Sequence, residues 1–276
     1  MLYICATPIG NLEDITIRAL AILKSADIIL CEDTRNSQKL LNYHGVSNKK
    51  LIALHEHNEN EVSRKVLDWL EQDLLIVQIS DAGTPGISDP GARLCNHIIE
   101  NGYKISPLPG ACAFVSLLSV AGLIETSFLF SGFLPNKTQQ RQKQLKTWQS
   151  VDYAIGIYES PHRIIGCLED IALTLGAETV ITFGRELTKQ FETIKKLSIN
   201  DLIDFVKNDT NQQKGEFVLI IHPKADSHDT SELTPEQIAA LELIAAELPA
   251  KKAVNLTNKL IGGNKDLMYQ YLLNQK

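Results

Sequence analysis

Short apolar runs alternate with longer amphipathic stretches in the first half of the chain, and this alternation limits the possible folds more than any other feature. The stretch 15–25 has Ile15, Ala19 and Ile22 at helical spacing, and the stretch 61–72 repeats the pattern. The runs between these stretches are continuously apolar, as strands of a parallel sheet are when helices cover both faces. We therefore predict a parallel α/β sheet with strands at 2–6, 27–31, 50–54, 74–79 and 103–108.

The second half of the chain predicts a mixed sheet. Strands are expected at 128–133, 153–158, 179–183, 190–198 and 216–221, with helices at 138–150, 160–175 and 200–208. The partial alternation of polar and apolar residues in 190–198 favours an antiparallel neighbour. The economical interpretation is two α/β domains, residues 1–114 and 115–223.

The end of the chain predicts a small helical domain, residues 233–276. The segment 225–233 is polar and is typical of a linker. Thr234 before Pro235 is a typical helix start, and further helices are expected at 249–260 and 265–273. This appendage could resemble a helix-turn-helix, although a docking or capping element is the favoured interpretation.

The composition excludes several classes of protein. No apolar run reaches the roughly 18 residues that span a bilayer, and the first residues lack the features of a signal peptide. The five cysteines are scattered and never spaced as CxxC, so neither a disulfide framework nor a zinc ribbon is expected, and a reducing cytoplasm fits best. A net charge of −6 argues against indiscriminate nucleic-acid binding but allows a local basic patch.

The loops after the predicted strands are where a ligand is expected, because such sheets bind ligands beyond the carboxyl ends of their strands. The loop 80–91, SDAGTPGISDPG, is rich in small residues that let the backbone approach a ligand closely. The loop 107–113 is similar, and Cys112 within it is interpreted as a packing residue because no histidine lies near it in the sequence. The loop 7–14 lacks a GxGxxG motif and is expected to be structural, with Asp14 capping the next helix.

Three charged clusters also follow predicted strands. The cluster 32–35 could orient a substrate or abstract a proton, or could equally form a helix cap and an ordinary ion pair. The clusters 158–163 and 184–189 could hold phosphate or ribose, or could be surface ion pairs. The charged residues concerned are Glu32, Asp33, Arg35, Glu159, His162, Arg163, Arg185, Glu186 and Lys189.

Residues 126–151 contain no Asp or Glu but four basic residues at spacings compatible with one broad helix face. This local charge favours an anionic polymer as partner over a generic solvated face. The motif HEH at 55–57 supplies too few ligands for a zinc site, so no metal is expected. The four basic residues are Lys137, Arg141, Lys143 and Lys146.

Eight motifs together carry a resemblance to a known family. In order they are ATPIGNLEDITIRAL, CEDTR, SDAGTPGISDPG, PLPGACAF, FLFSGFLPNK, YESPHR, GRELTK and GEFVLII. Across residues 1–222 the chain resembles the bacterial small-subunit (16S) ribosomal RNA cytidine 2′-O-methyltransferases of the tetrapyrrole methylase superfamily. The resemblance implies two α/β domains of tetrapyrrole-methylase type with S-adenosylmethionine bound between them. It also implies a homodimer whose substrate is a cytidine ribose of 16S ribosomal RNA in the small ribosomal subunit.

The same resemblance implies a set of donor-binding residues. Where relatives that act on tetrapyrroles have Gly-Asp-Pro, this chain has Gly83-Thr84-Pro85. The residues implied are Pro8, Gly83, Thr84, Ile87, Ser88, Ala111, Cys112, Ala113, Phe133, Tyr158, Glu216 and Phe217.

The expected chemistry is an in-line attack of the ribose hydroxyl on the donor methyl without a metal ion. A hydroxyl needs a base to remove its proton, and the sequence does not choose among the candidates. Two alternatives stay open, a methyltransferase acting on a tetrapyrrole carbon and a non-catalytic RNA-binding factor. The candidate bases are Glu32, Asp33, Asp81, Glu159 and His162, and Arg35, Arg163 and Arg185 are expected to steer phosphates.

Overall fold

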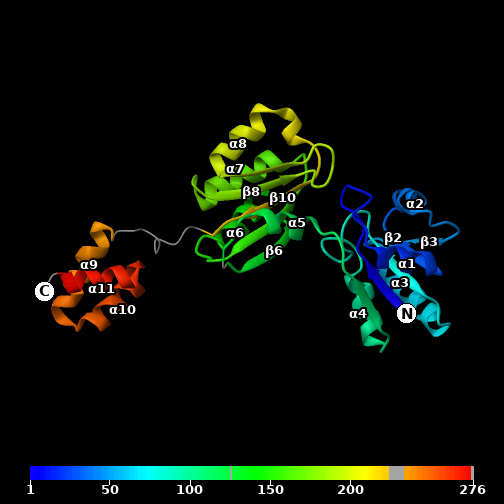
Figure 1. Ribbon diagram of the computed structural model, residues 1–276, viewed down its shortest axis with the longest axis horizontal. Helices are drawn as coiled ribbons and strands as arrows, with labels where there is room; N and C mark the ends of the chain where they lie inside the picture. Colours follow the sequence, from blue (N-terminus) through cyan, green and yellow to red (C-terminus); the bar gives the residue numbers. More distant parts are fainter. Residues whose placement is uncertain (125, 224–232, 275–276) are drawn as a thin grey trace. The chain divides into compact units, whose positions relative to one another are not determined.

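The computed structural model describes residues 1–124, 126–223 and 233–274 (Figure 1). The first sheet is entirely parallel, with strand order β3-β2-β4-β1-β5. This confirms the parallel sheet predicted from the apolar runs. Its strands are β1 (Leu2–Cys5), β2 (Ile28–Cys31), β3 (Lys50–Ala53), β4 (Ile76–Ile79) and β5 (Ile105–Leu108).

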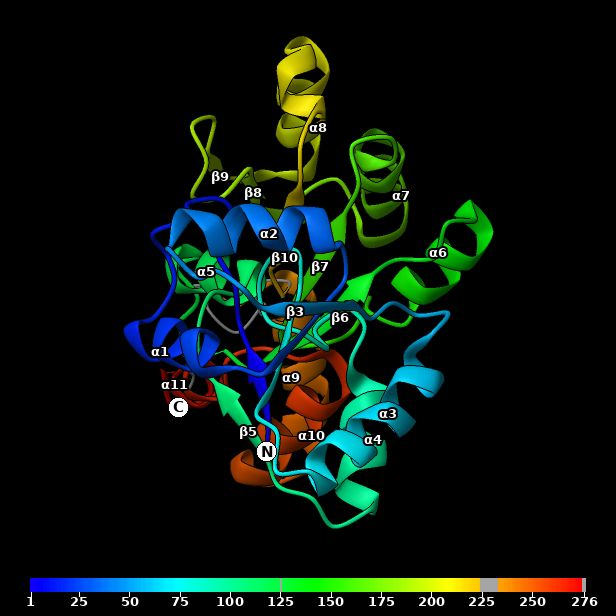
Figure 2. The same ribbon diagram turned by 90° about the vertical axis from the view of Figure 1, so that its right-hand side faces the viewer.

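Helices cover both faces of the first sheet. Successive strand residues alternate between two cores: Ile29 packs with α1 (Ile17–Ser25) and α2 (Thr34–Tyr43), and Ile28 packs with α3 (Glu59–Glu71) and α4 (Ala92–Glu100). Figure 2 shows α3 and α4 side by side, as their contacts require. The central strand β2, IILC, is apolar at every position because both of its faces are buried.

The cap of α1 differs from the prediction. The Thr16 hydroxyl accepts a hydrogen bond from the Ala19 N–H at 3.1 Å, so the helix begins at Ile17. Asp14 instead belongs to a turn in which its N–H donates to the Asn11 carbonyl. A threonine directly before the apolar pattern satisfied the capping geometry, and the aspartate two residues earlier lies outside the helix.

The second sheet is mixed, as predicted, with strand order β6-β7-β10-β8-β9. Strand β6 is parallel to β7, and every other pairing is antiparallel, including that of β9 with β8. The register of β6 shifts between Phe130 and Gly132. Its strands are β6 (Phe128–Phe133), β7 (Ala154–Glu159), β8 (Val180–Arg185), β9 (Thr193–Ser198) and β10 (Phe217–Ile221).

Helix α5 (Ala113–Val120) follows the first sheet but packs on the second. Phe114 and Leu117 of α5 share a core with Val218 of β10. A Cβ at Gly156 of β7 would lie 2.1 Å from the Phe114 ring, so this strand position requires glycine for the helix to pack there. The opposite face packs against α8 (Ile199–Asn208), and α7 (Ile164–Leu175) contacts both α8 and α6 (Thr138–Lys146). A short 3₁₀ helix, Thr210–Gln213, follows α8.

Both sheets belong to one compact unit, and the C-terminal helices form most of another. The three predicted helices are present as α9 (Pro235–Glu247), α10 (Ala250–Ile261) and α11 (Lys265–Asn274). Thr234 and Gln237 form a reciprocal capping box at the start of α9. Leu241, Val254 and Met268 are the centre of the small core. The predicted linker 225–233 lies almost entirely outside the described residues, and no described helix is both long and apolar enough to span a bilayer.

Candidate functional site

A cleft opens among the loop after β4, the start of α5 and the ends of β6, β7 and β10. It encloses about 810 Å³ of space outside the protein atoms, its open mouth included. The site therefore lies beyond the carboxyl end of β4, as the sheet topology favours. Ten of the twelve residues implied as donor-binding line it: Gly83, Thr84, Ile87, Ser88, Cys112, Ala113, Phe133, Tyr158, Glu216 and Phe217.

The floor of the cleft is held by two loops that pair with each other. Thr7 and Gly83 exchange two backbone hydrogen bonds, of 2.8 and 3.0 Å, and the Thr7 hydroxyl donates to the Ser80 carbonyl at 3.0 Å. Gly83 has a φ of 83°, a conformation that favours glycine. Pro8, which follows Thr7, does not line the cleft.

The start of α5 forms a second wall. Cys112 is the cap residue but contributes no side-chain cap bond, and the Phe114 N–H donates instead to the Tyr158 hydroxyl at 3.2 Å. Ala111 lies behind this wall, where its carbonyl accepts a hydrogen bond from the Thr84 hydroxyl at 3.0 Å. Burial, with a smaller contribution from Cys112, raises the pKa of Tyr158, so the phenol stays neutral.

Apolar side chains complete the cleft. The Phe133 and Tyr158 rings lie edge to face with centroids 5.7 Å apart, and Leu187 and Val218 add aliphatic surface. A cleft with an aromatic wall, small residues at Ala82 and Ala113 and a few polar groups fits a nucleoside. The residues that the sequence did not single out as donor-binding are Ile9, Ala82, Asp89, Glu159, Leu187 and Val218.

Three carboxylates line the cleft in different environments. Glu159 is buried, and its carboxylate accepts from the Ser160 N–H at 2.7 Å and pairs with Arg163 at 3.0 Å. Glu216 is largely exposed and pairs with Lys189 at 2.9 Å. Asp89 forms no ion pair within the described part of the chain.

Burial and neighbouring charges act on Asp89. They raise its pKa to about 7, with burial as the largest cause, followed by Glu32. Asp81 and Glu216 raise it further, whereas a hydrogen bond from Ser80 lowers it. Asp89 therefore changes protonation near neutral pH, whereas an ordinary aspartate is ionised there.

The cluster 32–35 forms the helix cap that was its structural alternative. The Asp33 carboxylate accepts from the Arg35 N–H at 2.8 Å and pairs with the Arg35 guanidinium at 2.9 Å, which lowers the pKa of Asp33 to about 2. Asp81 accepts from the Asp33 N–H at 3.1 Å and from the Asn36 side chain at 3.0 Å. Burial raises the pKa of Glu32, which lines a second cavity beside the cleft.

Of the residues predicted to be catalytic, Glu159 lines the cleft and the others do not. The Arg185 guanidinium is buried and donates to the carbonyls of Lys214 at 2.7 Å and Phe191 at 2.9 Å, so it holds two loops. His162 is exposed and does not line the cleft.

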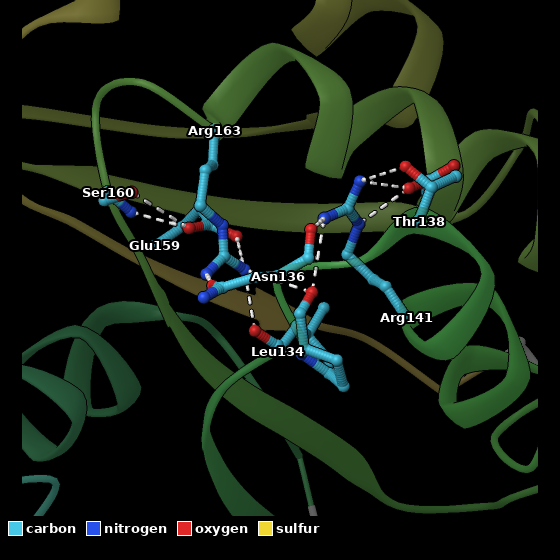
Figure 3. Close-up of polar contacts among 9 residues, drawn as sticks. Leu134, Asn136, Thr138, Arg141, Glu159, Ser160 and Arg163 are labelled. Atoms are coloured by element: carbon cyan, nitrogen blue, oxygen red, sulfur yellow. Dashed lines mark hydrogen bonds and ion pairs between the residues drawn. The ribbon is translucent and has the colours of Figure 1, made fainter.

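Arg163 also holds a loop. Its guanidinium lies between Glu159 and the segment after β6 and donates to the Leu134 carbonyl at 2.7 Å and to the Asn136 side chain (Figure 3). Phe133 lines the cleft, and Arg163 therefore links the loop that follows it to the Glu159 carboxylate.

The interpretation of 126–151 as one basic face is corrected at Arg141. This side chain is only 6% exposed and forms an ion pair with Asp170 of α7, so it is directed into the protein. Its spacing from Lys143 and Lys146 did not reveal this, because residues on opposite sides of a helix can be close in sequence. Lys137, Lys143 and Lys146 remain exposed.

The motif 55–57 lines the second cavity together with Glu32. Within residues 1–124, 126–223 and 233–274, no group of three or more His, Cys, Asp or Glu side chains is arranged to hold a metal ion.

Comparison with known proteins identifies the family. The family described as Tetrapyrrole (Corrin/Porphyrin) Methylases matches residues 1–203. The chain belongs to the tetrapyrrole methylase family. Residues 231–276 match a second family, described as RsmI C-terminal HTH domain. Members of the tetrapyrrole methylase family use S-adenosylmethionine, so this chain is a methyltransferase that depends on this donor.

Individual relatives of this tetrapyrrole methylase family member match over nearly their whole length. Ribosomal RNA small subunit methyltransferase I of Haemophilus influenzae is 45% identical over 98% of this chain and 95% of its own. The protein of the same name from Escherichia coli O157:H7 is 43% identical over 100% and 95%. The fold is similar to that of uroporphyrin-III C-methyltransferase from Thermus thermophilus complexed with S-adenyl homocysteine, with a TM-score of 0.55, 15% identity and coverage of 80% and 96%.

Proposed function

We propose that the cleft binds S-adenosylmethionine and that the protein methylates the ribose 2′-hydroxyl of a cytidine in 16S ribosomal RNA, within the small ribosomal subunit. The observation that carries the donor site is the cleft itself, in which ten implied donor-binding residues from separate parts of the chain meet. The ribosomal substrate is supported by the relatives, whose names specify ribosomal RNA of the small subunit. Such a substrate places the protein in the cytoplasm.

Different residues of the cleft bind different parts of the donor. Phe133 and Tyr158 offer an aromatic wall for a planar base, and the Gly83 loop lets the backbone approach the ligand. The donor supplies a methyl group made electrophilic by its bond to a cationic sulfur. The protein aligns the two reactants, and alignment alone can contribute roughly 7–11 kcal/mol towards lowering the barrier.

We propose the domain boundaries predicted from the sequence, with the donor cleft formed by the first two domains. Residues 1–114 contain the first sheet and residues 115–223 the second, and both contribute to the cleft. Residues 233–276 form the helical domain that matches the HTH family.

Transfer of labelled methyl groups tests the reaction. Incubation of the protein with tritiated S-adenosylmethionine and isolated small ribosomal subunits should label the RNA, and nuclease digestion should place the label on a cytidine sugar. Uroporphyrinogen should remain unlabelled. Labelling of the tetrapyrrole, or binding of subunits without any transfer, would support one of the two alternatives instead.

Filling the cleft tests the donor site. Ala113→Leu should weaken S-adenosylmethionine binding about tenfold or more, because the larger side chain occupies space that the ligand needs. Isothermal titration calorimetry with the donor and with S-adenosylhomocysteine measures this. Ser119→Leu, on an exposed position of the same helix, is the matched control and should bind normally. Equal affinity of both variants would place the donor elsewhere.

We also propose that the protein is a homodimer. Val115 and Val120 of α5, with Ile124 and Phe128 of the edge strand region, are each more than half exposed. Four large apolar side chains on neighbouring segments are typical of an interface.

Sedimentation equilibrium tests the homodimer. The mass should be twice the 30.6 kDa of one chain. Phe128→Glu should shift it towards the monomer, because the interface would have to bury a charge. Leu173→Glu, at an exposed position of α7, should leave it unchanged. A monomeric wild-type protein would contradict the proposal.

A further inference from the structure

A second cavity adjoins the donor cleft. It lies at the carboxyl end of β2 and the start of α4, and encloses about 1000 Å³ of space outside the protein atoms, open solvent included. Ser88 and Asp89 line both the cleft and this cavity. A molecule in the second cavity would therefore meet a donor in the cleft at the wall formed by these two residues.

We propose that the second cavity receives the acceptor nucleotide and that Asp89 removes the proton from its attacking hydroxyl. This inference rests on the proposed function, which supplies the donor. The hydroxyl oxygen forms a bond to the methyl carbon while the carbon–sulfur bond breaks and leaves its electron pair on sulfur. The proton of the hydroxyl passes to the Asp89 carboxylate.

The other carboxylates of the cleft are already engaged. Glu159 is buried in an ion pair with Arg163, and Glu216 pairs with Lys189. Both carboxylates are therefore occupied by partners within this chain. Asp89 has no such partner in the described part of the chain and stands where the two hollows meet.

The surroundings of Asp89 suit a base that works near neutral pH. Burial and the charges of Glu32, Asp81 and Glu216 raise its pKa to about 7, against a hydrogen bond from Ser80. The other charged or titratable groups that line the same cavity are His55, Glu56, His57, Glu59 and Arg93, and the Tyr158 phenol lines the cleft. A base whose pKa is near the working pH combines a sufficient ionised fraction with a strong affinity for the proton.

The far wall of the second cavity fits a nucleotide. Arg93 is exposed and has no ion-pair partner among the described residues, so it is available to a phosphate. Two N–H groups at the start of α4 are already engaged, since the Glu59 carboxylate accepts from Gly91 and Leu94 at 3.0 Å each. His55 lines the cavity, and its buried Nδ1 has no hydrogen-bond partner among the described residues.

The cavity also continues along the surface, as a polynucleotide requires. A third hollow between α3 and α4 shares Ala92 and Arg93 with it and adds Arg64, which is exposed. Asn60 and Asn96 line the same hollow. The Asn96 amide donates to Glu100, which also lines this hollow, at 2.8 Å, so the two arginines are the groups that provide contacts for successive phosphates. We therefore place the RNA path across α3 and α4.

Asp89→Asn tests the base, because the amide keeps the shape and removes the basicity. We expect kcat for methyl transfer to small subunits to fall about 10²–10⁴-fold, while calorimetry shows S-adenosylmethionine affinity within about threefold. Glu178→Gln, an exposed carboxylate between α7 and β8 that lines none of these hollows, is the control and should keep wild-type kcat. A kcat within threefold of wild type, or a loss explained by donor affinity alone, would overturn the assignment.

Stability against pH gives a readout independent of activity. The folded pKa of Asp89, about 7, lies above its unfolded value, so the folded state holds the proton more tightly between these values. The wild type thus loses stability as pH rises through this window. Asp89→Asn should raise Tm at pH 8 and leave it nearly unchanged near pH 4. An equal change at both values would contradict the environment assigned to Asp89.

Arg93→Gln tests the RNA path. We expect about a tenfold rise in KM for small subunits, a weaker dependence of KM on salt, and little change in kcat, because a phosphate contact contributes mainly to binding. Unchanged KM and salt dependence would exclude this path. Different results refute the proposed function and the role of Asp89. A wild-type protein that binds no donor or transfers no methyl to subunits refutes the proposed function, whereas an active wild type with an equally active Asp89→Asn variant refutes only the present inference.

Discussion

Asp170→Ala is expected to lower the free energy of unfolding by about 3–5 kcal/mol, because it leaves a buried guanidinium without its counter-charge. Asp170 and Arg141 are 8% and 6% exposed, and the Arg141 Nε donates to the carboxylate at 2.6 Å. The other carboxylate oxygen accepts from Gln142 at 2.7 Å. Urea unfolding followed by circular dichroism measures the loss.

The chain contains a matched control for Asp170 at the preceding position. Glu169 also pairs with a cation, Lys207, at 2.7 Å, but about half of each of these side chains is exposed. Glu169→Ala should therefore change the free energy of unfolding by less than about 1 kcal/mol. Equal effects at both positions would show that burial does not determine the contribution of these ion pairs.

Arg163→Met is expected to cost about 3 kcal/mol and to weaken donor binding. The Glu159 carboxylate is fully buried, and removal of its partner leaves a desolvated charge in the wall of the cleft. The same change releases the Leu134 carbonyl and the Asn136 side chain, which Arg163 holds beside Phe133. Urea unfolding and calorimetry with S-adenosylmethionine measure the two effects.

A second substitution separates charge from loop position in this network. Glu159→Gln in the Arg163→Met background should recover part of the stability, because a neutral amide costs less to bury than an unpaired carboxylate. It should not restore donor affinity, since the loop after Phe133 remains untied. A double variant no more stable than Arg163→Met would show that loss of the loop contacts, rather than the buried charge, accounts for the cost.

The candidate site was only partly accessible from the sequence. The loop 80–91 could be singled out because its glycines, prolines and small residues directly follow a buried strand. Asp81 and Asp89 both lie in that loop, and the composition of the loop could not show which of them reaches the ligand. Asp81 accepts hydrogen bonds from the Asp33 N–H and the Asn36 side chain, whereas Asp89 lines both the cleft and the second cavity.

The sequence also did not reveal which charged side chains have partners within the chain. Arg141, Arg163 and Arg185 resemble solvated or ligand-binding cations in the sequence, but each is directed at carboxylates or carbonyls of this chain. For Arg141 the tertiary structure decides this, because its partner Asp170 lies 29 residues away in the sequence. Only the packed chain shows whether a guanidinium is bonded internally.

The sequence by itself determined the parallel first sheet, the mixed second sheet, the three C-terminal helices and the family, since apolar periodicity and ordered motifs are local properties of the chain. Only the tertiary structure decided which loops meet. Leu187 and Val218 reach the cleft because α5 crosses from one sheet to pack on the other, with Phe114 seated over Gly156. Contacts between distant segments depend on the packing of whole layers, and no pattern of neighbouring residues encodes them directly.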